Sequence, residues 1–550
     1  MASSKLIIYQ VFTRLYGNRN TTRKQNGTIE ENGCGKMNDF TPAVLKQISR
    51  LGVSHIWYTG VIRHATMTDY SQYGIPRQHP AVVKGRAGSP YAITDYYDID
   101  PDLAVDVNGR MTEFEQLVER THKAGMKVII DFVPNHVARQ YHSISKPRGV
   151  RDLGAGDTPE NGFDPQNNFY YCPGQRFMPY FDLYHGEKDP YIEEPARATG
   201  NDCFHNAPGK NDWYETVKLN YGVDYYAGRV GHFDPVPNTW KKMTQILSFW
   251  AAKGIDGVRC DMAEMVPAEF WAYATGKVKQ KYPDLLFIGE VYNPGEYRHY
   301  LASGFDYLYD KVGMYDTMFQ IIRGQQSTQT ITNAWQQTDD IRQHMLYFLE
   351  NHDELRIASD FFAGKAQKAV PALVVNALMQ QNPFMLYAGQ EYGERGMDQE
   401  GFSGHDGRTT IFDYWSVDTL TRADKHQLTA DEQHLYETYA KVLGIARKEK
   451  AVAEGESYDL MYVNQQYHHQ YMFLRKAKSS QLLVVANFDN QSVTVNVRIP
   501  AHAFEFLGLK QKRYMATDLL TDTTMQLMLK ADETVAVEVV GYGAVILKLK

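Results

Sequence analysis

Cysteine is scarce in this sequence, with only Cys34, Cys172, Cys203 and Cys260 among 550 residues. They form no C-x-x-C pair and no cluster with histidine at zinc spacing, which argues against a zinc ribbon and against a disulfide-rich scaffold. We therefore expect free thiols. A Cys172–Cys203 disulfide stays open as an alternative if the protein is periplasmic or secreted.

Long apolar runs and blocks of like charge are also missing. No stretch approaches about eighteen apolar residues, so we predict no membrane span. The net charge of −7 and the lack of a basic patch argue against nucleic acid as a partner. No signal peptide is visible before the apolar run 6–9. The compartment stays open: cytoplasmic as the sequence stands, periplasmic or secreted if a signal was removed.

Short apolar runs alternate with longer helical patterns over the first 450 or so residues. This alternation is typical of βα units and a parallel sheet. We count eight strand-like runs, at residues 6–12, 54–58, 127–132, 255–260, 284–289, 305–309, 345–349 and 383–387. The economical interpretation is an α/β fold built on a (β/α)8 TIM barrel.

Two helix starts carry recognisable signals. Thr41 followed by Pro42 predicts an N-cap with proline at the first helical position. Thr112 with Glu115 at the third position after it predicts a capping box.

Two regions do not show the alternation of strand-like and helical patterns. Residues 137–233 are rich in Gly, Pro, Asn, Asp and Tyr, which predicts a loop-rich subdomain inserted after the third strand. The barrel then comprises 1–136 and 234–455. In 456–550 the strand-like runs are 471–475, 482–488, 492–499 and 534–549. Several of them alternate with period two, so we predict a C-terminal antiparallel β-sandwich.

Polar residues follow four of the predicted strands. They are Asp131, Asn135 and His136 after the third strand, Arg259 and Asp261 after the fourth, Glu290 after the fifth, and Asn351, His352 and Asp353 after the seventh. One such residue is ordinary, because turns and helix caps use Asp and Asn. Four strand ends that each carry a carboxylate indicate a shared site at the mouth of the barrel.

This set of residues suits the cleavage of glycosidic bonds. The reaction needs two carboxyl groups in different protonation states. Arg259 lies two residues before Asp261, so both side chains face the same way, and its charge favours an ionised Asp261 that acts as the nucleophile. No basic residue stands near Glu290 in the sequence. We therefore expect Glu290 to have a raised pKa and to act as the acid.

The same segments resemble the four signature regions of the α-amylase family. The motifs are D-x-x-x-N-H at 131–136, G-x-R-x-D at 257–261, the strand-end Glu290 and N-H-D at 351–353. Their order and spacing make the resemblance specific, and it covers about residues 5–450 and the C-terminal sandwich. It implies a retaining enzyme with Asp261 as nucleophile, Glu290 as general acid/base and Asp353 as the third carboxylate, which binds sugar hydroxyls.

The resemblance also implies a binding site for the sugar. Tyr91, in the segment Tyr91-Ala-Ile-Thr-Asp-Tyr, resembles the family tyrosine that stacks under the sugar at the cleavage subsite. His136, Arg259 and His352 match residues that line the same subsite. The expected partner is an α-glucan oligosaccharide or polysaccharide.

No cofactor is required for this chemistry, and calcium is the only metal that the resemblance suggests. Asn135 matches a residue that often binds a structural calcium ion. In calcium-binding amylases an Asp ligand usually stands where this sequence has Lys218. An ammonium group cannot ligate a cation, so we hypothesise that Lys218 replaces calcium and contacts Asn135 and nearby carboxylates. A surface lysine is the simpler alternative.

The residues that follow the nucleophile also depart from the family pattern, and they bear on specificity. Many starch-cleaving members carry Lys-His after the nucleophile, whereas here Glu264 and Met265 follow Ala263. The leading hypothesis is hydrolysis of α-1,4- or α-1,6-linked glucans. An α-glucan transglycosylase, such as a maltosyltransferase or a glucanotransferase, stays open. So does a non-catalytic sugar-binding family member. Chain length, endo or exo action and oligomeric state also stay open.

Overall fold

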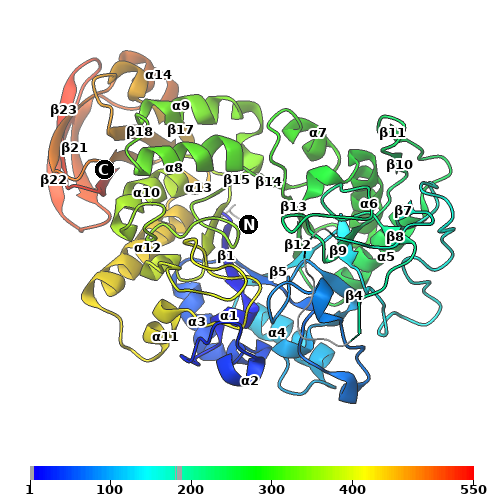
Figure 1. Ribbon diagram of the computed structural model, residues 1–550. Coiled ribbons are helices and arrows are strands. Elements are labelled where there is room, and N and C mark those ends of the chain that lie inside the picture. Colours follow the sequence, from blue (N-terminus) through cyan, green and yellow to red (C-terminus); the bar gives the residue numbers. More distant parts are fainter. Residues whose placement is uncertain (1–4, 180, 182–188) are drawn as a thin grey trace.

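A closed parallel barrel forms the centre of the molecule (Figure 1). The structure is a computed structural model that describes residues 5–179, 181 and 189–550. The barrel strands in chain order are β1 (Ile7–Phe12), β2 (His55–Thr59), β5 (Lys127–Phe132), β12 (Gly257–Cys260), β13 (Leu286–Gly289), β14 (Tyr307–Tyr309), β15 (Met345–Phe348) and β16 (Phe384–Tyr387). Each strand overlaps its predicted range, and the TIM barrel is confirmed.

The side chains inside the barrel form an apolar layer with polar groups above it. Ile8 and Ile288 belong to a buried apolar cluster contributed by barrel strands and the segment after β14. Side chains two residues apart on a strand point to the same side. Gln10 and Glu290 therefore follow these two isoleucines toward the carboxyl ends of the strands, and both are buried. Strand alternation thus places polar side chains at the mouth of the barrel.

Helices surround the barrel (Figure 1). They include α3 (Pro42–Arg50), α4 (Arg110–Lys123), α5 (Asn238–Ala252), α6 (Ala268–Lys281), α7 (Tyr297–Ala302), α8 (Asp316–Ile322), α9 (Gln329–Gln336), α10 (Val370–Leu378) and α12 (Ala430–Lys448). Thr41 caps α3 as predicted, because its side chain accepts a 3.3 Å hydrogen bond from the Val44 amide. Every helix in the described part of the chain is too short or too polar to serve as a transmembrane span.

The predicted capping box at Thr112 is wrong. Helix α4 begins two residues earlier, at Arg110. The Glu113 carboxylate instead accepts hydrogen bonds of 2.7–3.1 Å from the amides of Val105 and Asp106, which precede the helix. The acidic residue therefore holds the turn before the helix and does not cap the helix itself.

The inserted region is loop-rich, as predicted, and contains only short strands. They are β6 (His136–Ala138), β7 (Tyr171–Cys172), β8 (Ala196–Arg197), β9 (Thr216–Lys218), β10 (Val223–Asp224) and β11 (Val230–Gly231). The pairing of β6 with β9 sets His136 opposite Lys218. Cys172 and Cys203 are both free, so the structure does not contain the disulfide that was left open.

The C-terminal region forms an antiparallel sheet of six strands in the order β17-β18-β19-β24-β21-β22. These are β17 (Glu456–Asp459), β18 (Gln470–Ala477), β19 (Ser480–Asn487), β21 (Lys512–Asp518), β22 (Thr524–Leu529) and β24 (Gly543–Leu549). A two-stranded sheet of β20 (Val493–Arg498) and β23 (Thr534–Val539) packs against it. The predicted run 534–549 is therefore two strands separated by a turn, and β17, β21 and β22 are additions.

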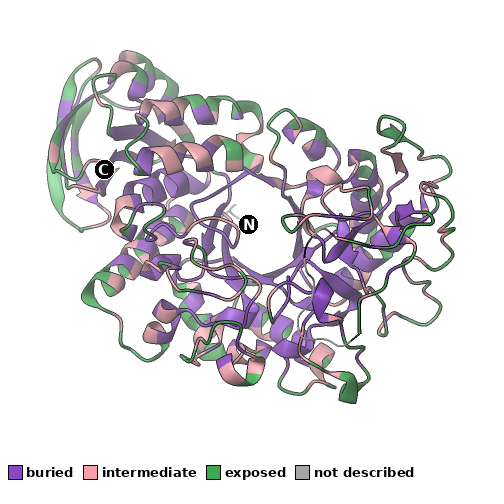
Figure 2. Ribbon diagram, viewed as in Figure 1, coloured by how far each residue is buried: buried purple, intermediate pink, exposed green. Residues whose placement is uncertain are grey.

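The inserted subdomain and the C-terminal domain lie on opposite sides of the barrel (Figure 1). The barrel strands are buried almost throughout, whereas the outer strands of the C-terminal domain carry many exposed residues (Figure 2). The barrel is thus the common core on which the two other parts pack.

Buried Arg475 of β18 joins the C-terminal domain to the barrel. Its guanidinium donates hydrogen bonds of 2.7–3.0 Å to the carbonyl oxygens of Met379, Ala451, Val452 and Gly455. Met379 caps α10 of the barrel, and the other three lie in the segment that leads into the C-terminal domain. One side chain therefore satisfies carbonyls on both sides of the junction.

We expect Arg475→Leu to destabilise the protein strongly, because four buried carbonyls lose their donor. The loss in apparent free energy of unfolding should be at least about 3 kcal/mol. Urea unfolding followed by tryptophan fluorescence measures it, with Arg513→Leu on the exposed face of β21 as the control. Equal midpoints for the two variants would contradict the proposed junction.

Candidate active site

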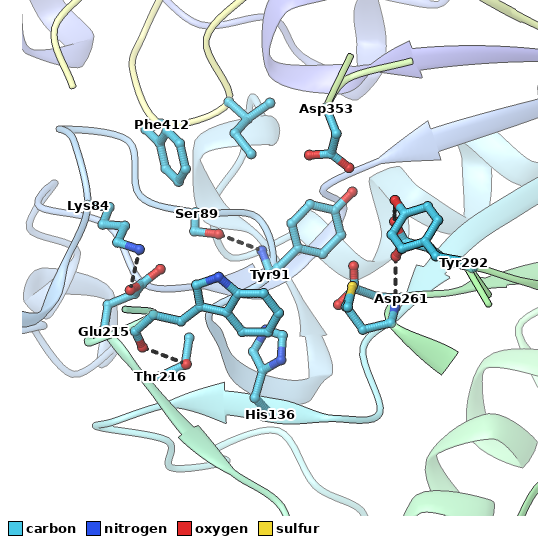
Figure 3. Close-up of a pocket in the computed structure, with 14 residues that line it drawn as sticks. Lys84, Ser89, Tyr91, His136, Glu215, Thr216, Asp261, Tyr292, Asp353 and Phe412 are labelled. Carbon is cyan, nitrogen blue, oxygen red and sulfur yellow. Dashed lines mark hydrogen bonds and ion pairs between the residues drawn. The ribbon is translucent and has the colours of Figure 1, made fainter. Parts of the chain in front are cut away.

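Five of the predicted site residues line one pocket. Tyr91, His136, Asp261, Glu290 and Asp353 all border a cavity of about 260 Å³. They come from segments that follow different barrel strands, as expected for a site at the carboxyl ends of a parallel barrel. Figure 3 shows Tyr91 between Asp353 and Asp261 on one side and His136 on the other.

Arg259 lies beneath the pocket and contacts two of its carboxylates. Its Nη1 is 2.8 Å from Oδ1 of Asp261, and its Nη2 is 2.7 Å from Oε2 of Glu290. The contact of Arg259 with Asp261 was expected from the sequence, in which no basic residue stands near Glu290. The fold adds the contact with Glu290, because β12 and β13 are adjacent in the barrel and Arg259 pairs with Ile288 in their register.

Glu290 also contacts two groups near the predicted nucleophile. Its Oε2 accepts a 2.8 Å hydrogen bond from the Met262 amide, and its Oε1 accepts one of 2.5 Å from the Tyr292 hydroxyl. Met262 has φ of +43°, in the left-handed region that side chains other than glycine rarely adopt. This strained residue turns its amide from the Asp261 segment toward Glu290, so the two carboxyl groups share one local framework.

His352 connects the third carboxylate to the aromatic floor of the pocket. Its Nε2 lies 3.0 Å from Oδ2 of Asp353 and 2.5 Å from the hydroxyl of Tyr91. Its Nδ1 lies 2.8 Å from Nε2 of Gln10, a residue of β1 that the sequence did not single out. His352 is only 3 % exposed, so it supports the pocket from below while Asp353 faces the cavity.

The carboxyl groups differ in their electrostatic environments. Burial raises the pKa of Asp261 well above its ordinary value, and the charges of Glu290 and Asp353 act in the same direction against Arg259. Arg259 favours the ionised form of Asp261 as expected, but it does not outweigh burial and the two neighbouring carboxyl groups. At Asp353 burial also raises the pKa, but His352 and then Arg259 outweigh it and bring the pKa to about 2. Two neighbouring aspartates thus resist ionisation to different degrees.

His136 is held neutral. Burial, followed by the charges of Lys218 and Lys84, lowers its pKa to about 3. Its ring packs at 5.2 Å from that of Trp213, which also lines the pocket. A neutral imidazole can both donate and accept hydrogen bonds, which suits contact with sugar hydroxyls.

Asn135 and Lys218 lie outside the pocket, next to His136. Buried Lys218 donates a hydrogen bond from Nζ to Oδ1 of Asn135 and lies 2.7 Å from Oδ1 of Asp202. Its Nζ also lies 3.4 Å from the carbonyl oxygen of Met265. The lysine is therefore not a surface residue, and it makes the contacts with Asn135 and a carboxylate that were hypothesised. In the described residues, this region included, no three acidic, His or Cys side chains are grouped to hold a metal.

Several lining residues were missed by the sequence reasoning, among them Lys84, Trp213, Glu215, Tyr292 and Phe412. The position of Tyr292 could have been predicted, because it stands two residues after Glu290. The others come from loops, where no periodicity indicates direction.

Glu264 stands where many starch-cleaving members of the family carry the lysine of a Lys-His pair. Its Oε2 accepts hydrogen bonds of 3.0 Å from the amides of Tyr292 and Asn293. It therefore braces the loop that carries Tyr292, and this side of the pocket lacks the ammonium group of the family pattern.

Comparisons with known proteins identify the family of the chain. The model of the α-amylase catalytic domain matches residues 29–455. Alpha-amylase 3 of Dictyoglomus thermophilum is 24% identical over 66% of this chain and 68% of its own. Alpha-amylase MalA of Haloarcula japonica is 23% identical over 89% of this chain, which spans 56% of that protein. Among solved structures, the noncanonic maltogenic alpha-amylase AmyB of Thermotoga neapolitana superposes with a TM-score of 0.64 at 19% identity, covering 100% of this chain and 99% of its own.

The opposite pKa directions of Asp261 and Asp353 predict opposite effects of neutralisation. Folding raises the pKa of Asp261, so its ionised form destabilises the fold at neutral pH, and Asp261→Asn should stabilise the protein at pH 7. This gain should shrink as the pH falls toward the ordinary pKa of aspartate, about 3.9. Thermal unfolding midpoints between pH 4 and pH 7 measure it.

Asp353→Asn is the matched control. The pKa of Asp353 is lowered on folding, so its stabilising contribution is present above the ordinary pKa and is lost as the pH falls through about 2. The variant should therefore be less stable at pH 7. The effect should be small, because 41% of the side chain is exposed and solvent screens it. If the unfolding midpoints of both variants at pH 7 moved in the same direction, the electrostatic environments assigned to Asp261 and Asp353 would be contradicted.

Proposed function

Because the chain belongs to the α-amylase family of glycoside hydrolases, we propose that it cleaves α-glucosidic bonds of α-glucans with retention of configuration. The observation that carries the proposal is the pair of contacts from Arg259 to Asp261 and Glu290. One guanidinium group reaches both carboxyl groups, which favours the short separation of about 5–5.5 Å typical of retaining enzymes over the wider gap that holds a water in inverting ones.

The first step forms a glycosyl-enzyme intermediate. An oxygen of ionised Asp261 attacks the anomeric carbon, the bond from that carbon to the glycosidic oxygen breaks, and Glu290 gives its proton to the departing oxygen. Tyr91 lies beneath the sugar, and Asp353 and His136 bind its hydroxyl groups. Arg259 stays positively charged throughout and offsets the charge that moves between the two carboxyl groups.

The second step regenerates the enzyme. Ionised Glu290 takes a proton from a water molecule, whose oxygen attacks the anomeric carbon and releases Asp261. A sugar hydroxyl as acceptor would give transfer by the same step, so the transglycosylase alternative differs only in the acceptor. Water and sugar compete on the side of Glu290, where Tyr292 and the loop braced by Glu264 shape the pocket.

We expect Asp261→Asn and Glu290→Gln to lower kcat on maltoheptaose by at least about 10³-fold. Glu290→Gln should still release fluoride in a burst from an α-maltosyl fluoride, because fluoride leaves without a proton, whereas Asp261→Asn should not. The products that the wild type forms from maltoheptaose are separated by chromatography. If all of them are shorter than the substrate, the enzyme hydrolyses it. If longer sugars also appear, the enzyme transfers glycosyl groups. Substantial turnover by pure Asp261→Asn would refute the assigned nucleophile.

We further propose that the Lys218 ammonium takes the place of a structural calcium ion. The Lys218 ammonium lies among oxygen atoms of Asn135, Asp202 and Met265, which are of the kind that would otherwise bind calcium. Burial lowers the pKa of Lys218 below its ordinary value, and the charge of Asp202 opposes that shift and so favours the ammonium form. The charge holds the inserted subdomain to the segment after Asp261.

Under this proposal, excess chelator leaves the thermal unfolding midpoint of the wild type unchanged. Lys218→Met should lower the free energy of unfolding by about 3–5 kcal/mol, because Asp202 loses its buried partner. Lys218→Asp supplies a ligand in place of the ammonium, and its midpoint should rise with added Ca²⁺. A fall of many degrees in the wild type on chelation would refute the replacement.

A further inference from the structure

A buried ion pair stands at one end of the pocket and takes no part in the mechanism described above. Nζ of Lys84 lies 3.0 Å from Oε2 of Glu215, and the two residues are only 7 % and 3 % exposed. Both line the cavity. In Figure 3 the pair lies on the opposite side of Tyr91 from Asp261 and Tyr292.

The chemistry assigns a direction to the pocket. The general acid protonates the departing sugar, so the side of Glu290 and Tyr292 holds the leaving group. The sugar that stays on Asp261, together with any residues at its non-reducing side, must extend the other way. That direction leads to Lys84 and Glu215, and this step rests on the proposed function.

The pocket wall near Lys84 and Glu215 is made of loops that are tightly packed against one another. The amides of Ala87 and Gly88 donate hydrogen bonds of 3.0 and 3.2 Å to the Phe412 carbonyl oxygen. Gly85 has φ of +65°, and a Cβ atom there would stand 2.2 Å from the same oxygen. The loop that carries Lys84 is thus tied to the loop after β16, while Glu215 comes from the inserted subdomain.

The ion pair can bind the terminal sugar of a glucan, but it blocks a glucan chain that would extend past this end of the pocket. A chain that continued beyond this point would have to separate two buried charges, which is costly because each would lose its partner. A terminal sugar needs no such separation. Oε2 of Glu215 faces the Lys84 ammonium, and both residues line the cavity, so the pair presents a cation and an anion to the hydroxyl groups of a terminal sugar.

We propose that Lys84 and Glu215 close the glycone end of the pocket and recognise the non-reducing end of an α-glucan. The enzyme is then exo-acting. It releases short products from chain ends and does not cut within chains. The ammonium and the carboxylate bind the hydroxyl groups at C4 and C6 of the terminal sugar, which an internal sugar cannot present in the same way.

The wild-type protein tests this directly with two p-nitrophenyl maltoheptaosides, one free and one with an ethylidene group bridging O4 and O6 of the terminal sugar. Chromatography should show the free substrate cleaved at least about tenfold faster than the blocked one. Equal rates would overturn the exo assignment and leave the proposed function intact. Cleavage of neither substrate would overturn the proposed function and this inference with it.

Variants at the ion pair test the residues themselves. Lys84→Met combined with Glu215→Gln should raise the ratio of blocked to free cleavage, because the end of the pocket no longer carries paired charges. Lys279→Met is the control: it breaks a half-buried pair with Asp306 at 2.9 Å, away from the residues that line the pocket, and should keep the wild-type ratio. An unchanged ratio in a folded double variant would overturn the role of the pair. If that variant does not fold, the wild-type comparison decides.

Discussion

The position of one guanidinium group between two carboxylates is the constraint on which the site depends. Arg259 is 1 % exposed and lies 5.2–5.6 Å from the ring centres of Trp57, Tyr91 and Tyr309. Ring faces attract a cation and also fix its plane, so its two nitrogens point to Asp261 and Glu290. A lysine in this position would supply the charge without the two-pronged geometry. The protein thereby holds the carboxyl groups of Asp261 and Glu290 around a single buried cation.

The barrel and its loops contribute to the site in different ways. The strands place groups by register, because alternation repeats every two residues and adjacent strands bring Arg259 and Glu290 together. These positions carry the bond-breaking chemistry that we propose. The loops set the ends of the cavity: Tyr292 and its brace Glu264 on one side, Lys84 and Glu215 on the other. Under our two proposals, the barrel strands determine the reaction type and the loops determine the selectivity for chain ends.

The same division explains what the sequence predicts. The eight strands and the strand-end carboxylates were predictable, because each is an apolar run followed by a polar residue. The pairing of Glu290 with Arg259 was not, because it crosses between strands. Strand β22 was missed because only two of its six residues are buried, so its alternation is weak. The contact of Lys84 with Glu215 joins loops 131 residues apart in sequence, and nothing local to either loop indicates it.

Arg475 makes the barrel and the C-terminal domain depend on each other. The segment before β17 looks like a natural place to separate two domains, yet its carbonyls rely on a donor from the second strand beyond it. A chain cut there would expose oxygen atoms that no barrel residue was selected to satisfy. A C-terminal domain grafted from a relative would need the same arginine in the same register. We therefore expect a chimaera joined at this boundary to keep both parts folded only when it keeps that one side chain.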